Sequence, residues 1–469
     1  MQSGGGGRQE RTAAIGRRLE EAVGEPLSGE VRRLSSGASR ETFAFSTPRG
    51  DLVVQIARGA GNKLVNATSQ AQLLQAAAET GVPVPAVVAD GGDDEILGSS
   101  WTVVEALSGT TDPQAILSGE GAPGGEELID GLAAALASIH RIDLDAVPVP
   151  AIEDPVALLR EWYDRLDEPH PAFELAFRAL QAERPAADRR TLVHGDFRMG
   201  NLMVGPDGLT GVLDWELAHA GDPVEDLGWL CVPAWRFTRP DRPAAGLATH
   251  EQLLDAYERH AGVAIDRAAL RWWELAGTLR WGVICVMQAF THLSGAIKSV
   301  EHAVIGRRAC EVEWDLLQLL DPQPAGEELE RAAKEVGSAA PAPHDRPTAV
   351  ELLEAVRGAL GEDVLPKLEG RPAFQTRVVL RALGIVRREL EHADEHAAVH
   401  AAALASVGCR DERELGQAIR EGTLGEREGG VFAAVRATVR AKLEVANPAY
   451  LTLTEAATTR TETAAREEQ

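Results

Sequence analysis

Residues 192–216, LVHGDFRMGNLMVGPDGLTGVLDWE, restrict the folds open to this chain more than any other segment. Two short apolar runs, residues 201–204 and 209–213, flank the sequence Gly-Pro-Asp-Gly. All four residues of that sequence favour turns, so the segment predicts a β-hairpin. Because a hairpin brings its two ends together, we expect Asn201 and Asp214 to lie side by side.

Three polar side chains lie at the ends of this hairpin: Asp196 before it, Asn201 at its start and Asp214 after it. Amide and carboxylate oxygens suit Mg²⁺, which keeps its other positions for water and phosphate oxygens. The spacing of His194, Asp196 and Asn201 matches that of the catalytic loop of protein kinases. Asp and Asn are also common in surface turns, but here they interrupt apolar runs at a spacing that assembles one site. We therefore predict Asn201 and Asp214 as metal ligands, and Asp196 as the base for an attacking hydroxyl.

The segment resembles the aminoglycoside-phosphotransferase-like family of small-molecule kinases through His-Gly-Asp at 194–196, Asn201 and Leu-Asp-Trp at 213–215. Residues 220–228, AGDPVEDLG, continue the pattern, and the resemblance covers residues 30–320. It implies an α+β, two-lobed protein-kinase-like fold with a small β-rich N-lobe and a mainly helical C-lobe. It also implies ATP as the phosphoryl donor with Mg²⁺, His194 as the residue that positions the catalytic loop, and Asp226 as a brace for that loop.

The first strands of such an N-lobe would hold the nucleotide. Residues 35–45 include a small, hydroxyl-rich loop between two expected strands, where backbone N–H groups could approach phosphates. Taken alone, this segment is an ordinary hairpin. With the family resemblance, Ser36, Gly37 and Ser39 are expected to cover the nucleotide. The strand over residues 100–109 corresponds to the hinge between the lobes, so the backbone from Glu105 to Leu107 is expected to meet the adenine.

The strand over residues 51–57 departs from the family pattern at its most characteristic position. In kinase-like folds this strand carries a basic residue that contacts the phosphates and pairs with a Glu on the following helix. Here Gln55 falls at the basic position, and Gln70, on a helix expected over residues 66–79, falls at the position of the Glu. Two amides can hydrogen-bond each other, whereas a lone buried Lys or Glu would be costly. Arg58 or Lys63 could supply the missing cation, although Arg58 faces the opposite side of the strand from Gln55.

The acceptor substrate is predicted from resemblance and local charge. Residues 81–85 and 194–215 look closest to kinase-like domains associated with acyl-CoA metabolism, some fused to acyl-CoA dehydrogenases, which phosphorylate hydroxyacyl-CoA. Arg198, Arg236 and Arg239 near the site favour such an anionic ester. The alternative small-molecule acceptor, an aminoglycoside or another amino sugar, would need a dense acidic cleft. A third interpretation, motivated by the two glutamines, is a nucleotide-binding or regulatory module with little turnover that recruits a protein partner.

The overall composition disfavours several other classes of protein. A length of 469 residues suggests two or three structural units. The net charge of −25 argues against binding to nucleic acid and to anionic membranes. The sequence shows no secretory signal and no long uncharged apolar run, so we predict a cytoplasmic protein without membrane insertion. The four scattered cysteines, Cys231, Cys285, Cys310 and Cys409, are expected to be buried free thiols.

A change in composition separates the C-terminal part from the kinase-like region, whose last helix is expected over residues 301–320. Residues 337–347 are rich in Pro and Ala and indicate a linker, and Thr348 with Glu351 forms a helix-starting capping box. Residues 345–353 and 371–378 look like a small uncharacterised helical domain found near such kinases, a candidate surface for a homodimer or a protein partner. The predicted division is a partly disordered N-terminal segment (1–25), N-lobe (26–108), C-lobe (109–322), linker (323–347), all-α domain (348–454) and disordered tail (455–469).

Overall fold

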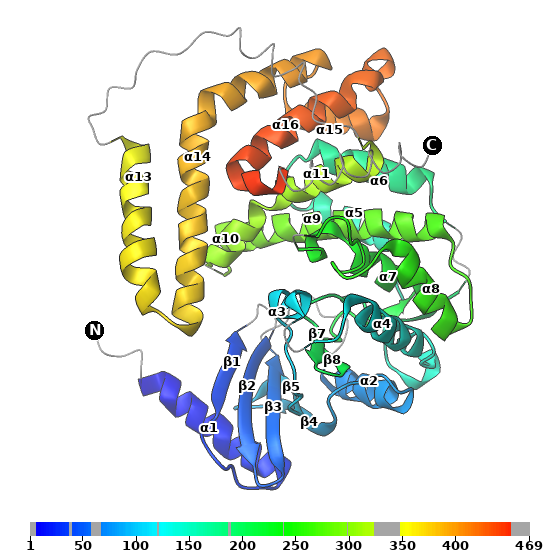
Figure 1. Cartoon of the computed structure of the whole chain (residues 1–469), viewed down its shortest axis with the longest axis vertical. Helices are drawn as coiled ribbons and strands as arrows, with labels where there is room; N and C mark the ends of the chain where they lie inside the picture. Colours follow the sequence, from blue (N-terminus) through cyan, green and yellow to red (C-terminus); the bar gives the residue numbers. More distant parts are fainter. Residues whose placement is uncertain are drawn as a thin grey trace. The chain divides into compact units, whose positions relative to one another are not determined.

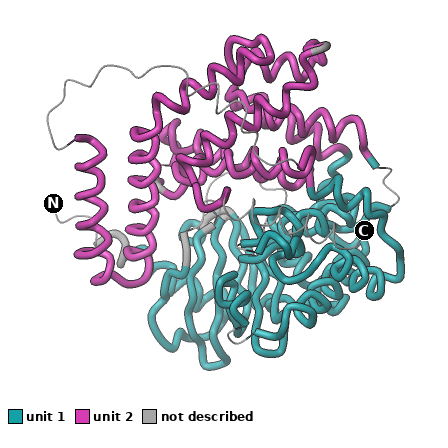
Figure 2. Tube along the Cα trace, turned by 45° about the horizontal axis from the view of Figure 1, so that its top comes forward, with its two compact units in different colours: residues 1–153, 185–274 teal, residues 154–184, 275–469 magenta. Residues whose placement is uncertain are grey.

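The computed structural model describes residues 6–36, 40–57, 67–119, 122–185, 189–237, 239–297, 299–322 and 348–451. The chain divides into two compact units, drawn in different colours in Figure 2. Unit 1 comprises residues 1–153 and 185–274, and unit 2 comprises residues 154–184 and 275–469. The helix α9, Arg267–Leu293, runs through the last of these boundaries.

A five-stranded antiparallel sheet with strand order β1-β2-β3-β5-β4 forms the first part of unit 1 (Figure 1). Its strands are β1 (Arg32–Ser36), β2 (Arg40–Thr47), β3 (Gly50–Ala57), β4 (Val87–Asp94) and β5 (Gly98–Glu105). In β3 the alternating residues Leu52, Val54 and Ile56 are buried, as expected for a strand with one covered face. They share an apolar cluster with Ile15 and Leu19 of α1 (Gly6–Val23). Gln55 lies between these positions and therefore faces the other side of the sheet.

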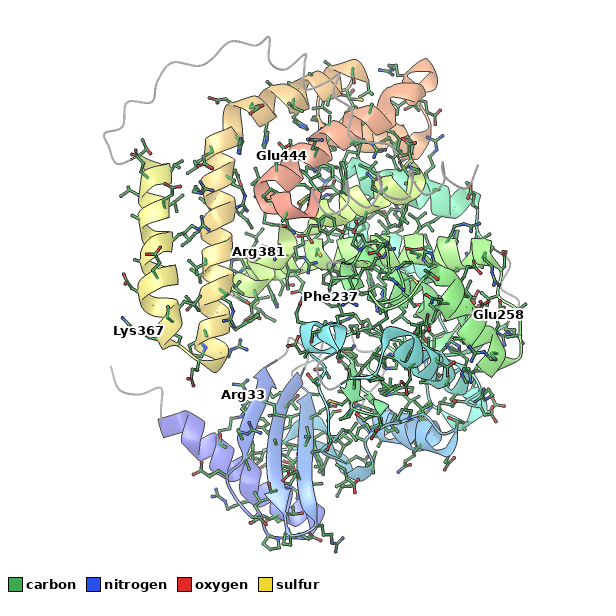
Figure 3. All side chains as sticks on the ribbon, in the orientation of Figure 1. Arg33, Phe237, Glu258, Lys367, Arg381 and Glu444 are labelled. Carbon is green, nitrogen blue, oxygen red and sulfur yellow. The ribbon has the colours of Figure 1, made fainter. Side chains whose placement is uncertain are left out.

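Ion pairs to a shared carboxylate also link the edge strand β1 to α1. Arg33, on β1 (Figure 3), and Arg11, on α1, both bond to the carboxylate of Glu41. The Glu41 side chain is almost fully buried, so the two guanidinium groups offset the cost of burying its charge.

The helix α2 (Ala67–Glu79) follows the sheet strand β3 in sequence and contacts β4 and β5. Its buried residues Gln70, Leu73, Leu74 and Ala77 follow the i, i+3, i+4, i+7 spacing of a core-facing helix stripe. A glutamine therefore occupies a position that the helix pattern would give to an apolar residue.

The predicted hairpin is confirmed: β7 (Leu202–Gly205) pairs with β8 (Gly208–Val212) through a turn at Pro206 and Asp207. A second short ladder joins β6 (Thr191–Val193) to β9 (His219–Gly221). The strand just before His194 therefore lies next to residues 219–221, which follow the hairpin. The remaining helices of at least six residues in unit 1 are α3 (Pro113–Ser118), α4 (Gly125–Ile139), α7 (Val224–Cys231) and α8 (His250–Ala261).

The regular secondary structure of the described residues in unit 2 is all helical. Its helices, besides the end of α9, are α5 (Pro155–Asp164), α6 (Pro171–Ala182), α10 (Val300–Gly306), α11 (Ala309–Leu320), α13 (Ala349–Gly358), α14 (Gly370–Ser406), α15 (Glu412–Glu421) and α16 (Val431–Ala446). The single helix expected over residues 301–320 was wrong, because Arg307 and Arg308 interrupt it between α10 and α11. Gly306 ends α10 at a close contact, where a Cβ would lie 2.5 Å from the Cβ of Ala289 on α9.

The C-terminal helices share one apolar core with α6 and α11. Leu175 of α6 and Trp314 of α11 belong to the same cluster as Ile419 of α15 and Val439 of α16. The helices α13 and α14 form a hairpin whose turn carries Lys367 (Figure 3). The domain boundaries placed from the sequence stay a prediction, but residues 412–446 pack against the kinase-like helices rather than apart from them.

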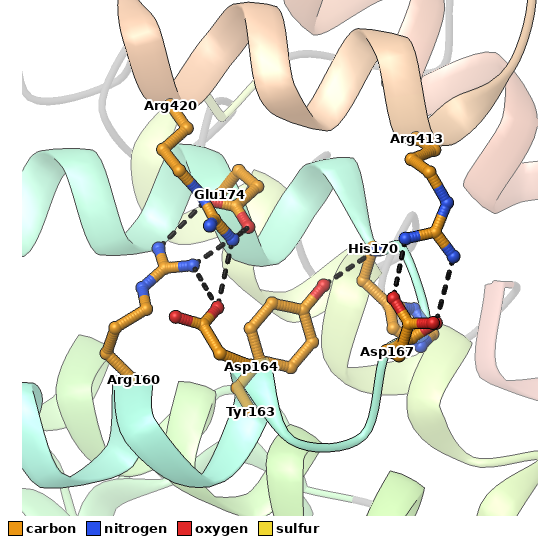
Figure 4. Close-up of polar contacts among 8 residues, drawn as sticks. All are labelled: Arg160, Tyr163, Asp164, Asp167, His170, Glu174, Arg413 and Arg420. Atoms are coloured by element: carbon orange, nitrogen blue, oxygen red, sulfur yellow. Dashed lines mark hydrogen bonds and ion pairs between the residues drawn. The ribbon is translucent and has the colours of Figure 1, made fainter.

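Ion pairs reinforce this shared core (Figure 4). Glu174, on α6, is almost fully buried and accepts bonds from Arg160 of α5 at 2.8 and 2.9 Å. Arg420, on α15, donates to the same carboxylate at 2.7 Å and to Asp164 at 3.0 Å. The acidic cluster therefore ties α15 to α5 and α6.

The cysteine prediction is confirmed, since all four thiols are free and buried. Among the described residues, no helix combines the length and the apolar character needed to cross a membrane.

Candidate active site

The catalytic loop follows β6 and turns at Gly195. This glycine has a φ of +79°, and a Cβ on it would lie 2.5 Å from the carbonyl oxygen of Leu217. A side chain here would be both strained and in collision with backbone, so the turn requires glycine. In the motif His-Gly-Asp, the side chains of His194 and Asp196 thus flank a position where the backbone conformation allows only glycine.

His194 is fully buried and connects the catalytic loop to the end of the hairpin. Its Nδ1 accepts a hydrogen bond from the backbone N–H of Asp196 at 3.2 Å, and its Nε2 lies 3.1 Å from the carbonyl oxygen of Leu213. Burial lowers the pKa of His194 despite the nearby charges of Asp226 and Asp196. A neutral imidazole that carries its hydrogen on Nε2 satisfies both contacts. Such a group can position the loop without taking part in proton transfer.

Asp226, on α7, holds the backbone of the same loop. Its Oδ2 accepts the N–H of His194 at 2.8 Å, and its Oδ1 accepts the N–H of Gly195 at 2.9 Å. His140 Nε2 lies 3.2 Å from Oδ2, and the Tyr257 hydroxyl lies 2.7 Å from His140 Nδ1. The carboxylate fixes two consecutive peptide groups, which is the geometry of the bracing role expected for it.

Three side chains hold the carboxylate of Asp196. Its Oδ1 accepts from Arg198 Nε and from Trp229 Nε1, both at 2.9 Å, and its Oδ2 accepts from Asn201 Nδ2 at 2.6 Å. The Arg198 guanidinium lies 4.6 Å from the centre of the Trp235 ring, a cation–π contact that orients it further. The predicted base therefore has a fixed orientation with a cation beside it.

Asn201 lies across the hairpin from Leu213, the residue that precedes Asp214. The N–H of Leu213 donates to the backbone oxygen of Asn201 at 2.8 Å, which joins the two ends of the hairpin. Asn201 Nδ2 donates to both the backbone oxygen and Oδ2 of Asp196, so the side-chain oxygen of Asn201 is turned away from Asp196. Asp214 has a positive φ of 60°, a conformation that a non-glycine residue adopts only when its surroundings enforce it.

This donor set fits Mg²⁺. One amide oxygen and one carboxylate leave coordination positions for water and phosphate oxygens, the arrangement that this metal prefers. A denser metal centre is not formed by the described residues, which contain no group of three His, Cys, Asp or Glu suited to holding a metal ion. Asn201 and Asp214 stay the predicted ligands.

A cavity of about 420 Å³ lies in unit 1 and is lined by residues of the sheet, of α2 and of the hairpin. This volume falls within the range of small-molecule and cofactor sites. Asp214 lines it, as do Glu105 and Leu107 of the predicted hinge. Much of the remaining lining is apolar and comes from Leu34, Ala44, Val53, Val104, Met203 and Val212. An apolar slot beside Asp214, one of the two predicted metal ligands, has the character expected for burying the base of a nucleotide.

Gln55 and Gln70 also line this cavity and hydrogen-bond each other, with Gln70 Nε2 donating to Gln55 Oε1 at 3.0 Å. By resemblance they fall at the two positions of the usual ion pair, and the structure brings these two side chains together. A neutral amide pair thus stands beside the cavity where kinase-like folds have a Lys–Glu pair.

Several predicted residues cannot be placed. Gly37 and Ser39, the Ser36 side chain, and Arg58 with Lys63 lie outside the described residues. Conversely, Trp229, Trp235 and His140 complete the site without having been predicted. Only the position of His140 at the end of a strongly amphipathic helix could have drawn attention to it, because the tryptophan contacts join residues distant in sequence.

Comparison with known families identifies the class of protein. Residues 30–271 match the model of the phosphotransferase enzyme family, just over half of the 469 residues. The protein therefore belongs to this family. Residues 366–450 match the model of a domain of unknown function (DUF6285). The expected kinase-like region with an additional C-terminal helical domain is confirmed.

Two acyl-CoA dehydrogenase family members are similar to part of this chain in sequence. The chain is 27% identical over 274 residues to acyl-CoA dehydrogenase family member 10 of Mus musculus, covering 53% of this chain and 26% of that protein. It is 28% identical over 213 residues to acyl-CoA dehydrogenase family member 11 of Gallus gallus, covering 42% of this chain and 27% of that protein. The chain thus spans about a quarter of the length of these relatives.

One crystal structure supports the fold directly. A protein from Ralstonia eutropha, provisionally described as an aminoglycoside phosphotransferase, is 24% identical with a TM-score of 0.51. The match covers 65% of this chain and 97% of that chain. The predicted α+β, protein-kinase-like fold is therefore confirmed.

Proposed function

We propose that the protein transfers the γ-phosphoryl group of ATP to a hydroxyl group of a small molecule, with Mg²⁺ as the metal. The observation that carries this proposal is an Asp196 whose carboxylate is oriented by Asn201, Arg198 and Trp229, on a catalytic loop whose hairpin also carries the cavity-lining Asp214. Phosphoryl transfer needs mainly positioning and charge stabilisation, and this set of groups can provide both.

The reaction balances with one proton released. The acceptor oxygen bonds to the γ-phosphorus, the bond between that phosphorus and the bridging oxygen of ADP breaks, and Asp196 takes the hydroxyl proton. Arg198 and Trp229 hold Oδ1 of Asp196 during this step. Asn201 and Asp214 would hold Mg²⁺, which when bound neutralises charge on the phosphate oxygens.

A hydroxyacyl-CoA-type acceptor is the more specific part of the proposal. It is supported by the similarity to two acyl-CoA dehydrogenase family members. Two of the three arginines expected to favour this ester bond to other groups of the protein: Arg236 bonds to the Cys231 carbonyl and to Glu274. Arg239 donates to the Leu117 carbonyl at 2.6 Å. An aminoglycoside or amino sugar is the alternative acceptor.

The neutral pair Gln55–Gln70 favours a second candidate function, a nucleotide-binding regulatory module with low turnover. The C-terminal helical domain would then recruit a protein partner. Both candidate functions require nucleotide binding. Only the phosphotransferase requires transfer of the phosphoryl group to an acceptor, so a turnover measurement distinguishes the two.

A thermal-shift experiment with Mg²⁺ and ATP tests the shared step. A ligand that binds only the native state raises the melting temperature, so the wild type should be stabilised. Asp214→Ala should lose this shift, and Asp207→Ala, an exposed aspartate in the turn of the same hairpin, should keep it. No shift for the folded wild type with ATP or GTP would reject a nucleotide-dependent function. If the shift is present, turnover is then measured with hydroxyacyl-CoA and amino-sugar acceptors.

A further inference from the structure

Two arginine side chains converge between α13 and α14, which lie side by side in unit 2 (Figure 1). Arg357 belongs to α13 and Arg388 to α14, and both residues are half-buried. A Cβ on Gly384 of α14 would lie 3.3 Å from Arg388 Nη1 and 3.6 Å from Arg357 Cζ. The guanidinium groups of two helices therefore meet over one residue that has no side chain.

Neither the backbone conformation nor the backbone packing of α14 requires a glycine at position 384. Its φ is not positive, and the atoms nearest to a Cβ there are the ends of the two arginine side chains. A glycine inside a helix costs about 1 kcal/mol relative to alanine. What Gly384 provides is room for both guanidinium groups to approach the helix.

Two other arginines near this point are engaged in ion pairs within unit 2. Arg381, on α14 (Figure 3), donates to Glu311 of α11 at 3.2 Å. Arg387, also on α14, donates to Glu354 of α13 at 3.2 Å and to Glu391 at 2.8 Å. The protein itself therefore supplies the counter-charges for these two cations.

Arg357 and Arg388, by contrast, form no ion pair with a carboxylate of the described residues. Arg388 Nε donates to the carbonyl oxygen of Val445 at 2.7 Å, which fixes the guanidinium group without neutralising it. Within the described part of the chain Arg357 has no hydrogen-bond partner, although its Nε is buried. Burial and the neighbouring arginines lower the pKa of Arg388. Two positive charges thus lie close together without a counter-charge, in a chain whose net charge is −25.

We propose that the guanidinium groups of Arg357 and Arg388 bind the phosphate group of a small molecule. A phosphate monoester carries a charge of about −1.5 to −2 near neutral pH, which matches two guanidinium groups without counter-charges. Guanidinium N–H groups also fit the geometry of phosphate oxygens and form charge-assisted hydrogen bonds with them. The site belongs to unit 2 and does not depend on the phosphotransferase activity proposed for unit 1.

Isothermal titration calorimetry on the full chain tests this site, with glycerol 3-phosphate and inorganic phosphate as probes. The titrations are made without Mg²⁺, at about pH 7.5, where a monoester is mostly a dianion. Both probes should bind, and the one with the lower Kd identifies the source of the phosphate group as an ester or as free phosphate. Acetate, which carries a single charge, should bind more weakly than either.

The decisive variant is Arg357→Met, which removes the charge and keeps an unbranched apolar side chain of similar length. Both Kd values should rise by about tenfold or more, as for the loss of hydrogen bonds to a charged group. Arg410→Met removes the same charge from an exposed position before α15 and should leave both Kd values unchanged. Phosphate probes that do not bind the folded wild type would overturn the proposal. Equal Kd values in the wild type and Arg357→Met, or an equal loss in Arg410→Met, would also overturn it.

Thermal unfolding separates binding from a structural role for Arg357. Its charge disfavours the charged form of Arg388 and gains no ion pair among the described residues, so Arg357→Met should not lower the melting temperature in chloride. Glycerol 3-phosphate should raise the melting temperature of the wild type more than that of Arg357→Met. A variant that is less stable in chloride and gains as much from the probe as the wild type would make Arg357 a structural residue and refute the site.

Discussion

Two buried carboxylates, Asp226 in unit 1 and Glu313 in unit 2, each lie beside a buried histidine but are stabilised by different kinds of donor. His140 Nε2 lies 3.2 Å from Asp226, and His170 Nδ1 lies 3.3 Å from Glu313. Asp226 also accepts two backbone N–H groups of the catalytic loop. Glu313 instead accepts from the Lys442 ammonium at 3.3 and 3.4 Å. One carboxylate fixes peptide groups, and the other joins the side chains of separate helices.

The pKa values of His194, whose backbone bonds to Asp226, and of His170, beside Glu313, are shifted in opposite directions. In the catalytic loop, burial lowers the pKa of His194. At His170 burial also acts to lower the pKa, but the charge of Glu313 and a bond to Glu168 outweigh it and raise the pKa to about 9. Burial acts to raise the pKa of Glu313, but Lys442 and His170 bring it down to about 2.

This difference separates two uses of buried charge in one chain. A neutral histidine and backbone donors set the shape of the catalytic loop. A charged histidine and a lysine hold helices together at a place where no ligand is expected. Variants at the first carboxylate should therefore alter the site, and variants at the second should alter only stability.

The largest effect is expected for Asp226→Asn. The asparagine amino group would face one of the two backbone N–H donors and leave it buried without an acceptor. The free energy of unfolding should fall by about 3 to 5 kcal/mol, and Mg–ATP affinity should fall with the loss of loop geometry. Urea unfolding and calorimetry measure the two quantities. The exposed Asp207→Asn serves as control, and an Asp226→Asn protein with wild-type stability and affinity would refute the bracing role.

Glu313→Gln should have a somewhat smaller effect on stability and none on the site. It leaves His170 and Lys442 without their shared counter-charge, which should lower the free energy of unfolding by about 3 kcal/mol. The Kd for Mg–ATP should stay at the wild-type value in the folded protein. A loss of nucleotide affinity comparable with that of Asp226→Asn would remove the distinction between the two carboxylates.

The parts of the fold and site that follow local rules were predictable from the sequence. The Gly-Pro-Asp-Gly turn determines the hairpin, and the hairpin places Asn201 next to Leu213, the residue before Asp214. Alignment with the family pattern placed Gln55 and Gln70 at partner positions, and their hydrogen bond agrees with that placement. The hairpin needed only the residues of one turn, and the glutamine pair needed two short segments compared with the pattern of a known family.

The parts that depend on distant contacts were not predictable. Strand β4 contains Asp90, Gly91 and Gly92, which have low strand propensity, and it forms because it pairs with β5. Trp101 of β5 packs over Gly91 so closely that a Cβ there would lie 2.6 Å from its ring. Similarly, the hydrogen bond from Trp229 to Asp196 joins residues 33 positions apart, and no local sequence pattern predicts it.

The two histidines should give stability profiles of opposite slope with pH. The raised pKa of His170 means that its contribution is fully present below its unfolded value of about 6.5 and is lost as the pH rises through 9. Between pH 7 and 8.5 the loss should be about 2 kcal/mol. The lowered pKa of His194 has the opposite sign, so its contribution is present above about pH 6.5 and declines as the pH falls towards the folded value.

Urea unfolding across this pH range, on the wild type and His170→Gln, tests the assignment. The variant should lose the decline above pH 7 and keep the decline on the acid side. An alkaline decline of the same size in both proteins would assign the slope to another group.

The smallest effect is expected for Arg420→Ala, which tests whether charge or apolar packing holds α15 to α6. The Arg420 side chain is 47% exposed, whereas the Arg160 side chain that bonds to the same Glu174 is 18% exposed. Arg160 can satisfy the carboxylate when Arg420 is removed, so the cost should stay below about 1 kcal/mol, as for most exposed ion pairs. Ile419→Ala, which empties a fully buried position on the same helix, should cost about 2 to 5 kcal/mol in urea unfolding. A larger loss of stability in Arg420→Ala than in Ile419→Ala would mean that the C-terminal helices are attached mainly through the ion pairs of Glu174. Exposed ion pairs would then stabilise unit 2 as strongly as the buried ion pair of Glu313 does.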